Sequence, residues 1–449
     1  MAKSFPVPGG MPSFWHSQPD ALDDHRSTES LPKSSDIVVI GAGFAGASTA
    51  HHCLDLAHGA KKPSIVILES RQACSGATGR NGGHLKPDVY NSIGTLAAEY
   101  GVDAAAEVAG FEVDNLETLK SFIEKEEINC DLEVDSVFDA QFDNAYCAKL
   151  SARLESLVAN GSKASDQVDF IPGQAAEAVA GVKDAVGCYS SRAGRLWPYK
   201  LVTQLLRRVV SAGANLQTHT PVLSVSERPG VDGQWTVTTP RGAIRTKWVV
   251  FASNAYTSAI APEYKGTVVP VRGTCSHITV PKPPPSPLRS SYTFRFNTWD
   301  YDYLIPRPDG SVVVGGGKST YLDDQGNWYD NTDDSRLIDP AARYFDDYMQ
   351  RHFHGWDRTG AYADQVWTGI MGYTADSLPH VGHIPHKHGQ LVIAGFNGHG
   401  MPQIFLSARG IARMITEETA YEDTGLPLLF QTTATRLKRK MDPAQAKEE

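Results

Sequence analysis

Long apolar runs, patterned cysteines and an excess of positive charge are all missing from this sequence of 449 residues. No run approaches the ~20 apolar residues that a membrane helix needs, and residues 1–20 hold no apolar core of a secretory signal. The six cysteines form no CxxC pair and no regular framework, which favours reduced thiols. Lys and Arg number 42 against 51 Asp and Glu, which argues against a nucleic-acid partner. We expect a cytoplasmic globular protein with no membrane partner.

A cluster of histidines near the C-terminal end lacks the features of a metal site. The segment 379–389 carries four imidazoles among two prolines and two glycines, a composition that favours a turn without fixed ligand geometry. No carboxylate lies nearby in the sequence. We therefore predict no metal.

The first positive feature is a glycine-rich turn between two short apolar segments. IVVI at 37–40 and SIVILE at 64–69 predict strands buried in a parallel sheet, and the small residues between them predict a helix. In this context GAGFAG at 41–46 predicts a dinucleotide site rather than an unrelated glycine-rich turn, because its glycines allow a tight turn and close approach of a pyrophosphate. Glu69 is placed to accept from ribose hydroxyls. The predicted contacts are Gly41, Ala42, Gly43, Phe44, Ala45, Gly46, Glu69, Ser70 and Arg71.

A second glycine-rich segment, SGATGRNGGH at 75–84, follows the second strand. Such a loop lets backbone lie flat beside a ring system, although taken alone it could be a flexible loop. Beside the fingerprint it resembles the isoalloxazine-contacting segment of the D-amino-acid-oxidase-type (DAO family) FAD oxidoreductases, especially the gamma-glutamylputrescine oxidoreductase-like branch. The resemblance spans roughly residues 13–420. Four further segments match in the family's order, namely TPV at 220–222, VVFASNA at 249–255, TADSLPHVG at 374–382 and GFNGHGM at 395–401.

The resemblance implies an enzyme that binds FAD without a covalent link and takes hydride from the carbon beside a substrate nitrogen. The hydride would pass to flavin N5, and the imine would hydrolyse in water. The implied partners are a small-molecule amine, N-substituted amine or amino acid, and O2 or another electron acceptor; the oligomeric state stays open. The further implied cofactor contacts are Gly76, Ala77, Thr78, Arg80, Asn81, Gly82, Gly83, His84, Leu85, Val222, Ala252, Ser253, Asn254, Tyr256, Gly395, Phe396, Asn397, Gly398, His399, Gly400 and Met401.

Aromatic residues alternate at Trp299, Tyr301 and Tyr303, so on one strand their side chains would share a face. Such a stripe can belong to a core, but in the family the equivalent strand faces the substrate cavity. His84 and His399 lie in the two flavin loops, where either the backbone or the side chain could act. The candidate catalytic residues are therefore His399, Tyr303, Tyr301, Trp299 and His84.

Two positions depart from the pattern of relatives that are specific for amino acids or carry covalent flavin. Those relatives place an Arg, or in some sarcosine oxidases a flavin-linking cysteine, where this chain has Ile370 and Met371. Arg80 falls where dimethylglycine-type dehydrogenases carry a flavin-linking histidine. We therefore expect non-covalent FAD and an amine or N-substituted amine rather than a simple α-amino acid. Arg272 could bind an anion, although structural packing is the simpler interpretation.

Buried-strand character returns at 248–253 and 391–396, which predicts an α/β fold with a discontinuous Rossmann-like FAD-binding domain and an antiparallel-sheet substrate domain. This is the glutathione-reductase-type, D-amino-acid-oxidase-like arrangement. Periodicity predicts helices at 92–128, 198–211, 335–353 and 402–417. The predicted segments are an N-terminal arm at 1–32, the FAD-binding domain at 33–91, 191–265 and 363–425, the substrate domain at 92–190 and 266–362, and a C-terminal tail at 426–449.

Two other functions stay open at this point. An NAD(P)H-dependent flavin hydroxylase would share the first fingerprint, but it needs a second Gly-Asp flavin motif late in the chain, where this sequence has GFNGHG. A flavoprotein with structural FAD and a binding role is opposed only by the intact flavin loops.

Overall fold

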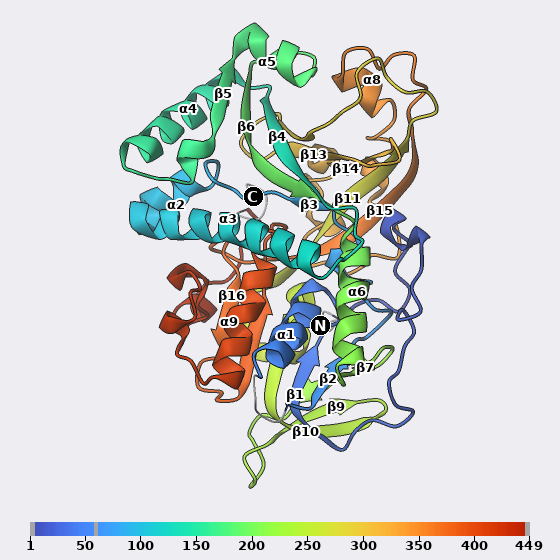
Figure 1. Cartoon of the computed structure of the whole chain (residues 1–449), viewed down its shortest axis with the longest axis vertical. Coiled ribbons are helices and arrows are strands. Elements are labelled where there is room, and N and C mark those ends of the chain that lie inside the picture. The colour runs from blue at the N-terminus through green and yellow to red at the C-terminus, as the bar shows by residue number, and fades with distance from the viewer. Residues whose placement is uncertain (1–4, 58–61, 445–449) are drawn as a thin grey trace.

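A mixed sheet with parallel central strands forms one half of the protein. The computed structural model describes residues 5–57 and 62–444. The strands of this first sheet are β1 (Ser34–Ile40), β2 (Ile65–Leu68), β7 (Asn215–Gln217), β8 (Ser224–Val225), β9 (Trp235–Thr239), β10 (Gly242–Phe251), β16 (His380–His383) and β17 (Gln390–Ala394). Their order is β16-β17-β10-β1-β2-β7, with β9 beside β10 and β8 beside β9 (Figure 1).

The central strands of this sheet bring distant cofactor motifs to one edge. β1 pairs in parallel with β10 and β2, β10 with β17, and β2 with β7. Parallel strands end at the same edge, where ligands of open α/β sheets bind. Gly41, Glu69, Ala252 and Gly395 each directly follow one of these strands. The sheet therefore collects four predicted cofactor contacts at one place.

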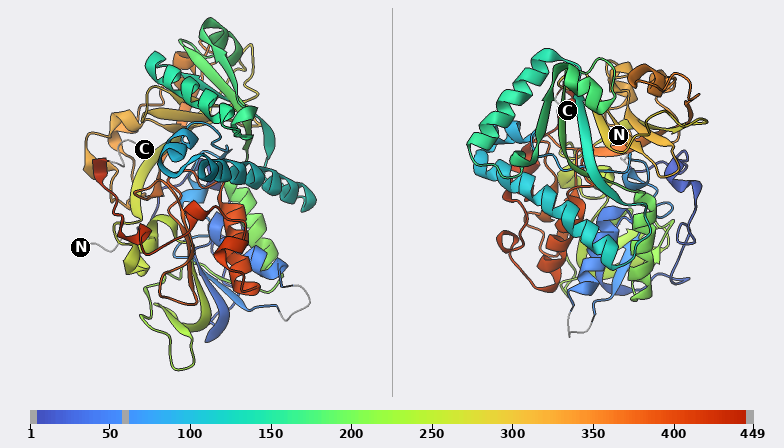
Figure 2. Two further views of the ribbon diagram at one scale, coloured as in Figure 1. Left: turned by 90° about the vertical axis from the view of Figure 1, so that its left-hand side faces the viewer. Right: turned by 45° about the horizontal axis from the view of Figure 1, so that its top comes forward.

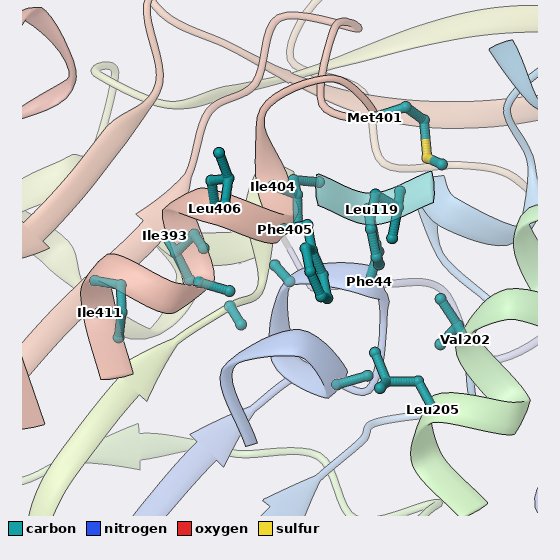
Figure 3. Packing of buried hydrophobic residues seen from close by; sticks show 14 of the residues in the cluster. Phe44, Leu119, Val202, Leu205, Ile393, Met401, Ile404, Phe405, Leu406 and Ile411 are labelled. Carbon is teal, nitrogen blue, oxygen red and sulfur yellow. The ribbon is translucent and has the colours of Figure 1, made fainter. Parts of the chain in front are cut away.

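Helices cover this sheet, and others lie on the second half of the protein (Figure 1). The helices are α1 (Phe44–Asp55), α2 (Ile93–Tyr100), α3 (Val102–Lys125), α4 (Asn144–Ala159), α5 (Gly173–Ala180), α6 (Pro198–Ser211), α7 (Thr257–Ile260), α8 (Tyr348–His352) and α9 (Ile404–Thr416). The rings of Phe44 and Phe405 stack with centroids 6.4 Å apart, which joins α1 to α9. Leu119 of α3 and Leu205 of α6 belong to the same buried cluster (Figure 3). One core therefore fixes these helices on the sheet.

The second sheet is larger and mostly antiparallel. Its strands are β3 (His84–Leu85), β4 (Glu133–Gln141), β5 (Asp169–Pro172), β6 (Gly187–Arg195), β11 (Val269–Thr279), β12 (Ser291–Arg295), β13 (Tyr301–Pro306), β14 (Val312–Gly316) and β15 (Tyr362–Tyr373). Their order is β15-β11-β14-β13-β12-β4-β6-β3, with β5 beside β6. The long helix α3 runs between this sheet and the helices of the first one (Figures 1 and 2).

Two predicted helices differ from the structure. The helix at 92–128 is broken at Gly101, whose φ of 92° ends α2 before α3 begins, and α3 ends at Lys125. Of the helix at 335–353 only 3-10 turns and α8 form, because Asp347 takes a left-handed φ of 51° and interrupts the periodic segment. The helix at 198–211 has the predicted bounds.

The strand order also differs from the predicted segments at two places. β15 pairs with β11 in the second sheet, although the segment 363–425 was assigned to the FAD-binding domain. The boundary between 190 and 191 falls inside β6. Each strand is continuous in the sheet, so a cut based on motif positions divides a structural unit. Across residues 5–57 and 62–444, no helix has the length and apolar character needed to cross a bilayer.

Candidate active site

A cavity of about 1100 Å³ extends from the turn after β1 to the face of the second sheet. It is lined by most of the predicted site residues, from both glycine-rich loops, from the segment after β10 and from the loop at 395–401. The predicted residues that do not line it are Ala42, Gly46, Gly83, Leu85, Gly395 and Trp299. The fold thus brings the segments of the resemblance together around one space.

The turn after β1 has the shape that a pyrophosphate requires. Gly41 has a φ of 115°, and a Cβ there would lie 2.5 Å from the carbonyl oxygen of Ala252. A Cβ on Gly46 would lie 1.9 Å from the carbonyl oxygen of Gly41, so only glycine lets α1 start this close to the strand. Gly43 faces Thr78, whose Oγ1 accepts from the amide of Phe44 at 3.1 Å. These contacts fit the phosphate end of FAD at the start of α1.

Glu69 connects the two sides of this cradle. One carboxylate oxygen accepts from the amide of Ala42 at 2.9 Å, and the other accepts from the amide of Arg71 at 3.0 Å and the hydroxyl of Ser70 at 3.1 Å. Glu69 also lines the cavity, so its carboxylate can accept from a ribose hydroxyl.

Two arginines, one just before the second glycine-rich segment and one within it, share one buried carboxylate. Arg71 donates to both oxygens of Asp334 at 2.8 and 3.0 Å, and Nε of Arg80 lies 3.3 Å from the same carboxylate. The N-terminal arm closes this cluster, because Arg80 donates to the carbonyl of Met11 and the amide of Met11 donates to the carbonyl of Asp334. Trp15 of the arm is fully buried and donates to the carbonyl of Asn81. The cluster therefore ties the second glycine loop to Asp334 and to the N-terminal arm.

Tyr303 marks the contact between the second glycine loop and the second sheet. A Cβ on Gly82 would lie 2.3 Å from its ring, and a Cβ on Gly315 would lie 2.1 Å from it on β14. Its hydroxyl lies 3.1 Å from Sγ of Cys275, and burial raises the pKa of the phenol well above its usual value. Tyr303 is thus a fixed, neutral wall of the cavity.

Of the three aromatic residues predicted to share one face of a strand, two lie on the same strand. Tyr301 and Tyr303 lie on β13 and line the cavity. The prediction for Trp299 is wrong, because the strand begins at Tyr301 and Trp299 lies in the preceding turn, where it packs against a separate cluster. A tight turn between β12 and β13 therefore ends the alternation.

His84 is a neutral group in this site. Its Nε2 lies 2.8 Å from the hydroxyl of Ser291 on β12. Burial, reinforced by the positive charge of Lys86, lowers the pKa of His84 to about 3. An imidazole with so low a pKa is a weak base.

His399 has the opposite character. Its Nε2 lies 2.8 Å from a carboxylate oxygen of Glu112 on α3, and Gln403 donates to the other oxygen at 2.7 Å. Burial lowers the pKa of His399, but the charge and the hydrogen bond of Glu112 outweigh it, so the pKa is raised above its usual value. The amide of Asp88 donates to the same carboxylate at 2.7 Å. Glu112 therefore favours the protonated form of His399 at the cavity wall.

Lys86, Glu112, Asp139 and Arg295 are functional groups that the sequence analysis did not single out. Lys86 and Arg295 line the cavity and both contact the buried carboxylate of Asp139. A signal was present for Glu112, because its charge interrupts an apolar helix pattern. Glu112 lies four residues after Val108 and four before Leu116 on the buried face of α3.

The positions that depart from related families are filled by groups with other tasks. Ile370 and Met371 line the cavity as apolar residues, and Arg80 is engaged by Asp334. Arg272 lies outside the cavity lining and donates to the carbonyls of Asn327 and Arg336, which is the packing role. Among the described residues no group of His, Cys, Asp or Glu is arranged to hold a metal ion.

Comparisons with known proteins agree with this site. The family model DAO, FAD dependent oxidoreductase, matches residues 36–414. Gamma-glutamylputrescine oxidoreductase of Escherichia coli K12 is 24% identical over 387 residues, which cover 85% of this chain and 83% of the relative. Among solved structures, glycine oxidase from Geobacillus kaustophilus has a TM-score of 0.69 at 17% identity and covers 87% of this chain and 96% of its own. L-amino acid deaminase from Proteus myxofaciens has a TM-score of 0.68 at 16% identity and covers 93% and 97%.

These findings confirm the predicted fold class, the enzyme class and FAD as the cofactor. The structural likenesses extend over nearly the whole of both chains, and the family match spans the fingerprint and the C-terminal flavin segment. The chain therefore belongs to the DAO family of FAD-dependent oxidoreductases.

Proposed function

We propose that this enzyme oxidises the C–N bond of an amine, N-substituted amine or amino acid and releases an imine that hydrolyses in water. Bound FAD would accept the hydride at N5. The relatives named above carry an amine or an amino acid in their names, which supports the substrate class.

The observation that carries the proposal is that neither cavity histidine is available as a free base. The pKa of His84 is lowered to about 3, and Nε2 of His399 is occupied by its hydrogen bond with Glu112. A hydroxyl substrate would need a strong base to remove its proton during hydride loss. An amine that enters neutral brings the lone pair that drives the transfer, so it needs no such base. The site therefore suits a C–N bond better than a C–O bond.

The chain's own residues orient the substrate and exclude water. Tyr303, held between Gly82 and Gly315, sets the distance between the second sheet and the glycine loop. The protonated His399 supplies positive charge beside the loop that precedes α9, where it would stabilise negative charge gained on reduction. Tyr301 leaves the neighbouring wall aromatic.

Location and oxidant are part of the proposal. All six cysteines are buried and free, which is consistent with a reducing compartment such as the cytoplasm. We propose O2 or another acceptor as the oxidant that returns the cofactor to its starting state.

The test is anaerobic stopped-flow absorbance of the purified yellow protein against polyamines, N-methyl amines and amino acids. We expect an amine to bleach the flavin band and NADPH to leave it unchanged, and adding oxygen then separates an oxidase from a dehydrogenase. Bleaching by NADPH alone would favour the hydroxylase. A protein that binds FAD but responds to neither class would favour a structural flavin.

A further inference from the structure

We propose that Arg295, supported by Lys86, binds an anionic group of the substrate, so that the substrate is an amine that also carries a carboxylate away from the reacting C–N bond. The inference rests on the proposed amine oxidation and names the substrate class within it.

Arg295 is a buried cation with free hydrogen-bonding capacity. It ends β12, is only 8% exposed and lines the cavity. Its Nε donates to the two carboxylate oxygens of Asp139 at 3.0 and 3.1 Å. Across the described part of the chain, Nη1 and Nη2 have no hydrogen-bond acceptor, and neither is sealed from the cavity as the buried unpaired nitrogens of Arg307 are. These two nitrogens form a fork that matches a carboxylate.

The carboxylate of Asp139 joins Arg295 to a second cation, Lys86. Nζ of Lys86 lies 3.0 Å from the same carboxylate, so two cations share one anion. All three side chains are largely buried, with exposed fractions of 13% for Lys86, 1% for Asp139 and 9% for Arg295. The nearby carboxylate of Asp88 accepts from the backbone amides at the start of α2, at 2.8 Å from Asn91, and does not bond to Arg295. Nη1 and Nη2 of Arg295 are therefore the groups of this cluster that remain available to an anion in the cavity.

The register of the second sheet places this fork away from the flavin loop. On β12 and β13, Thr293 lies opposite Tyr303 and Arg295 lies opposite Tyr301. Opposite residues share a face of the sheet, and Tyr303 is the residue that touches Gly82. Arg295 therefore lies two residues further along β12, roughly 7 Å beyond the level of the glycine loop.

The part of the cavity wall that β15 forms beside the flavin loop holds no cation for a carboxylate. Ile370 and Met371 of β15 are apolar there, and Met371 lies against Gly398. The ring of Tyr301 lies under the guanidinium of Arg295, with 5.5 Å between the guanidinium carbon and the ring centroid. This ring covers the face of the guanidinium and leaves its edge for the anion. A substrate with the amine at the loop and the carboxylate several atoms away would reach both ends.

Binding is tested first, without turnover. The holoenzyme is titrated with butyrate and valerate and with the matching neutral amides, and binding is followed by the change in flavin absorbance. We expect the carboxylates to bind and the amides to bind at least tenfold more weakly. Arg295→Met should abolish this preference, and Arg295→Lys, which keeps the charge without the fork, should retain part of it.

Arg192→Met serves as the matched control, because Arg192 lies on the same sheet in an exposed pair with Glu117 and does not line the cavity. It should leave carboxylate binding unchanged. Melting temperature and flavin content are compared for all variants. If Arg295→Met does not fold, Arg295→Lys decides the point. Equal affinity of the wild type for carboxylates and amides, or unchanged carboxylate affinity in the Arg295 variant that folds, would overturn the inference.

Turnover then separates this inference from the proposed function. Anaerobic flavin reduction is compared for ω-amino acids with three to five carbons and for alkylamines of the same length. We expect kcat/KM to favour the ω-amino acids at least tenfold, and Arg295→Met to remove this preference mainly through KM. Equal rates with both series would keep amine oxidation and refute the anion site. Carboxylate binding without flavin reduction by any amine would refute the proposed function and keep the anion site.

Discussion

Replacing Asp334 with Asn tests whether one buried carboxylate holds the flavin loop, the N-terminal arm and the second sheet together. The side chain of Asp334 is 0% exposed. Its carboxylate accepts hydrogen bonds from Arg71 at 2.8 and 3.0 Å, and Nε of Arg80 lies 3.3 Å from it. Asn has nearly the same shape as Asp but no charge, so the variant lacks the carboxylate that pairs with the guanidinium groups of Arg71 and Arg80. Breaking a buried ion pair in this way costs about 3–5 kcal/mol of unfolding free energy.

The expected change in melting temperature follows from the size of the chain. An unfolding entropy of ~2.1 cal/mol/K per residue gives ~0.9 kcal/mol/K for a chain of this length, so the loss corresponds to about 3–5 °C. The control is Asp333→Asn, one residue earlier. Asp333 pairs with Arg336 at 2.7 Å with side chains 24% and 75% exposed, and an exposed pair is worth about 0–1 kcal/mol.

Thermal unfolding is followed by circular dichroism for both variants at the same saturating FAD concentration. We expect Asp334→Asn to melt several degrees below Asp333→Asn and to lose flavin more readily on dilution, because Arg71 and Arg80 line the cofactor cavity. Equal melting temperatures for the two variants would refute the argument that Asp334 is a structural anchor.

Two further substitutions test the cofactor cradle and the charge at the cavity wall. Gly46→Ala should prevent FAD binding, because the added Cβ would lie 1.9 Å from the carbonyl oxygen of Gly41. The control is Gly110→Ala, whose added Cβ has no neighbouring atom within 4 Å and should stabilise the protein by about 0.4–1 kcal/mol. Flavin content and melting temperature are measured for both variants. Glu112→Gln should lower the pKa of His399, because it removes the charge that outweighs burial, and so the loss of the His399 proton moves to lower pH. In the wild type, the stability that the His399–Glu112 pair contributes is fully present below the pKa of His399 in the unfolded chain. It is lost as the pH rises through the raised pKa of His399 in the folded protein. A pH profile of flavin reduction that does not shift toward acid would contradict the assignment.

The parts of the fold that the sequence predicted well are those decided by neighbours in the chain. The turn at Gly41 and the helix at 198–211 follow from contiguous patterns, and Pro198 begins α6 where a missing amide hydrogen costs nothing. The same holds for the four strand ends that carry cofactor motifs, because a parallel sheet must bring them to one edge.

The errors arise where a side-chain hydrogen bond in a turn or a distant strand pairing decides the local conformation. The alternation at Trp299 ends in a turn that Asn297 stabilises by accepting from the amides of Trp299 and Asp300 at 2.9 and 2.8 Å. β15 follows β11 along eleven paired residues and therefore belongs to the second sheet, although flavin motifs follow it directly in the sequence. Periodicity alone contains neither contact.

The substrate end of the cavity shows why the family pattern stops short of the substrate. Glu112 interrupts an apolar helix face, and Arg295 is a buried charge at the end of β12, so each predicts a buried partner. Glu112 bonds to His399 and Gln403, which lie 287 and 291 residues later in the chain, and the sequence gives no means of choosing these partners. Cofactor contacts come from backbone in fixed motifs, whereas this end is built from single side chains on separate strands and helices. Substrate choice can therefore change by one substitution at a position such as Arg295 while every flavin motif stays intact.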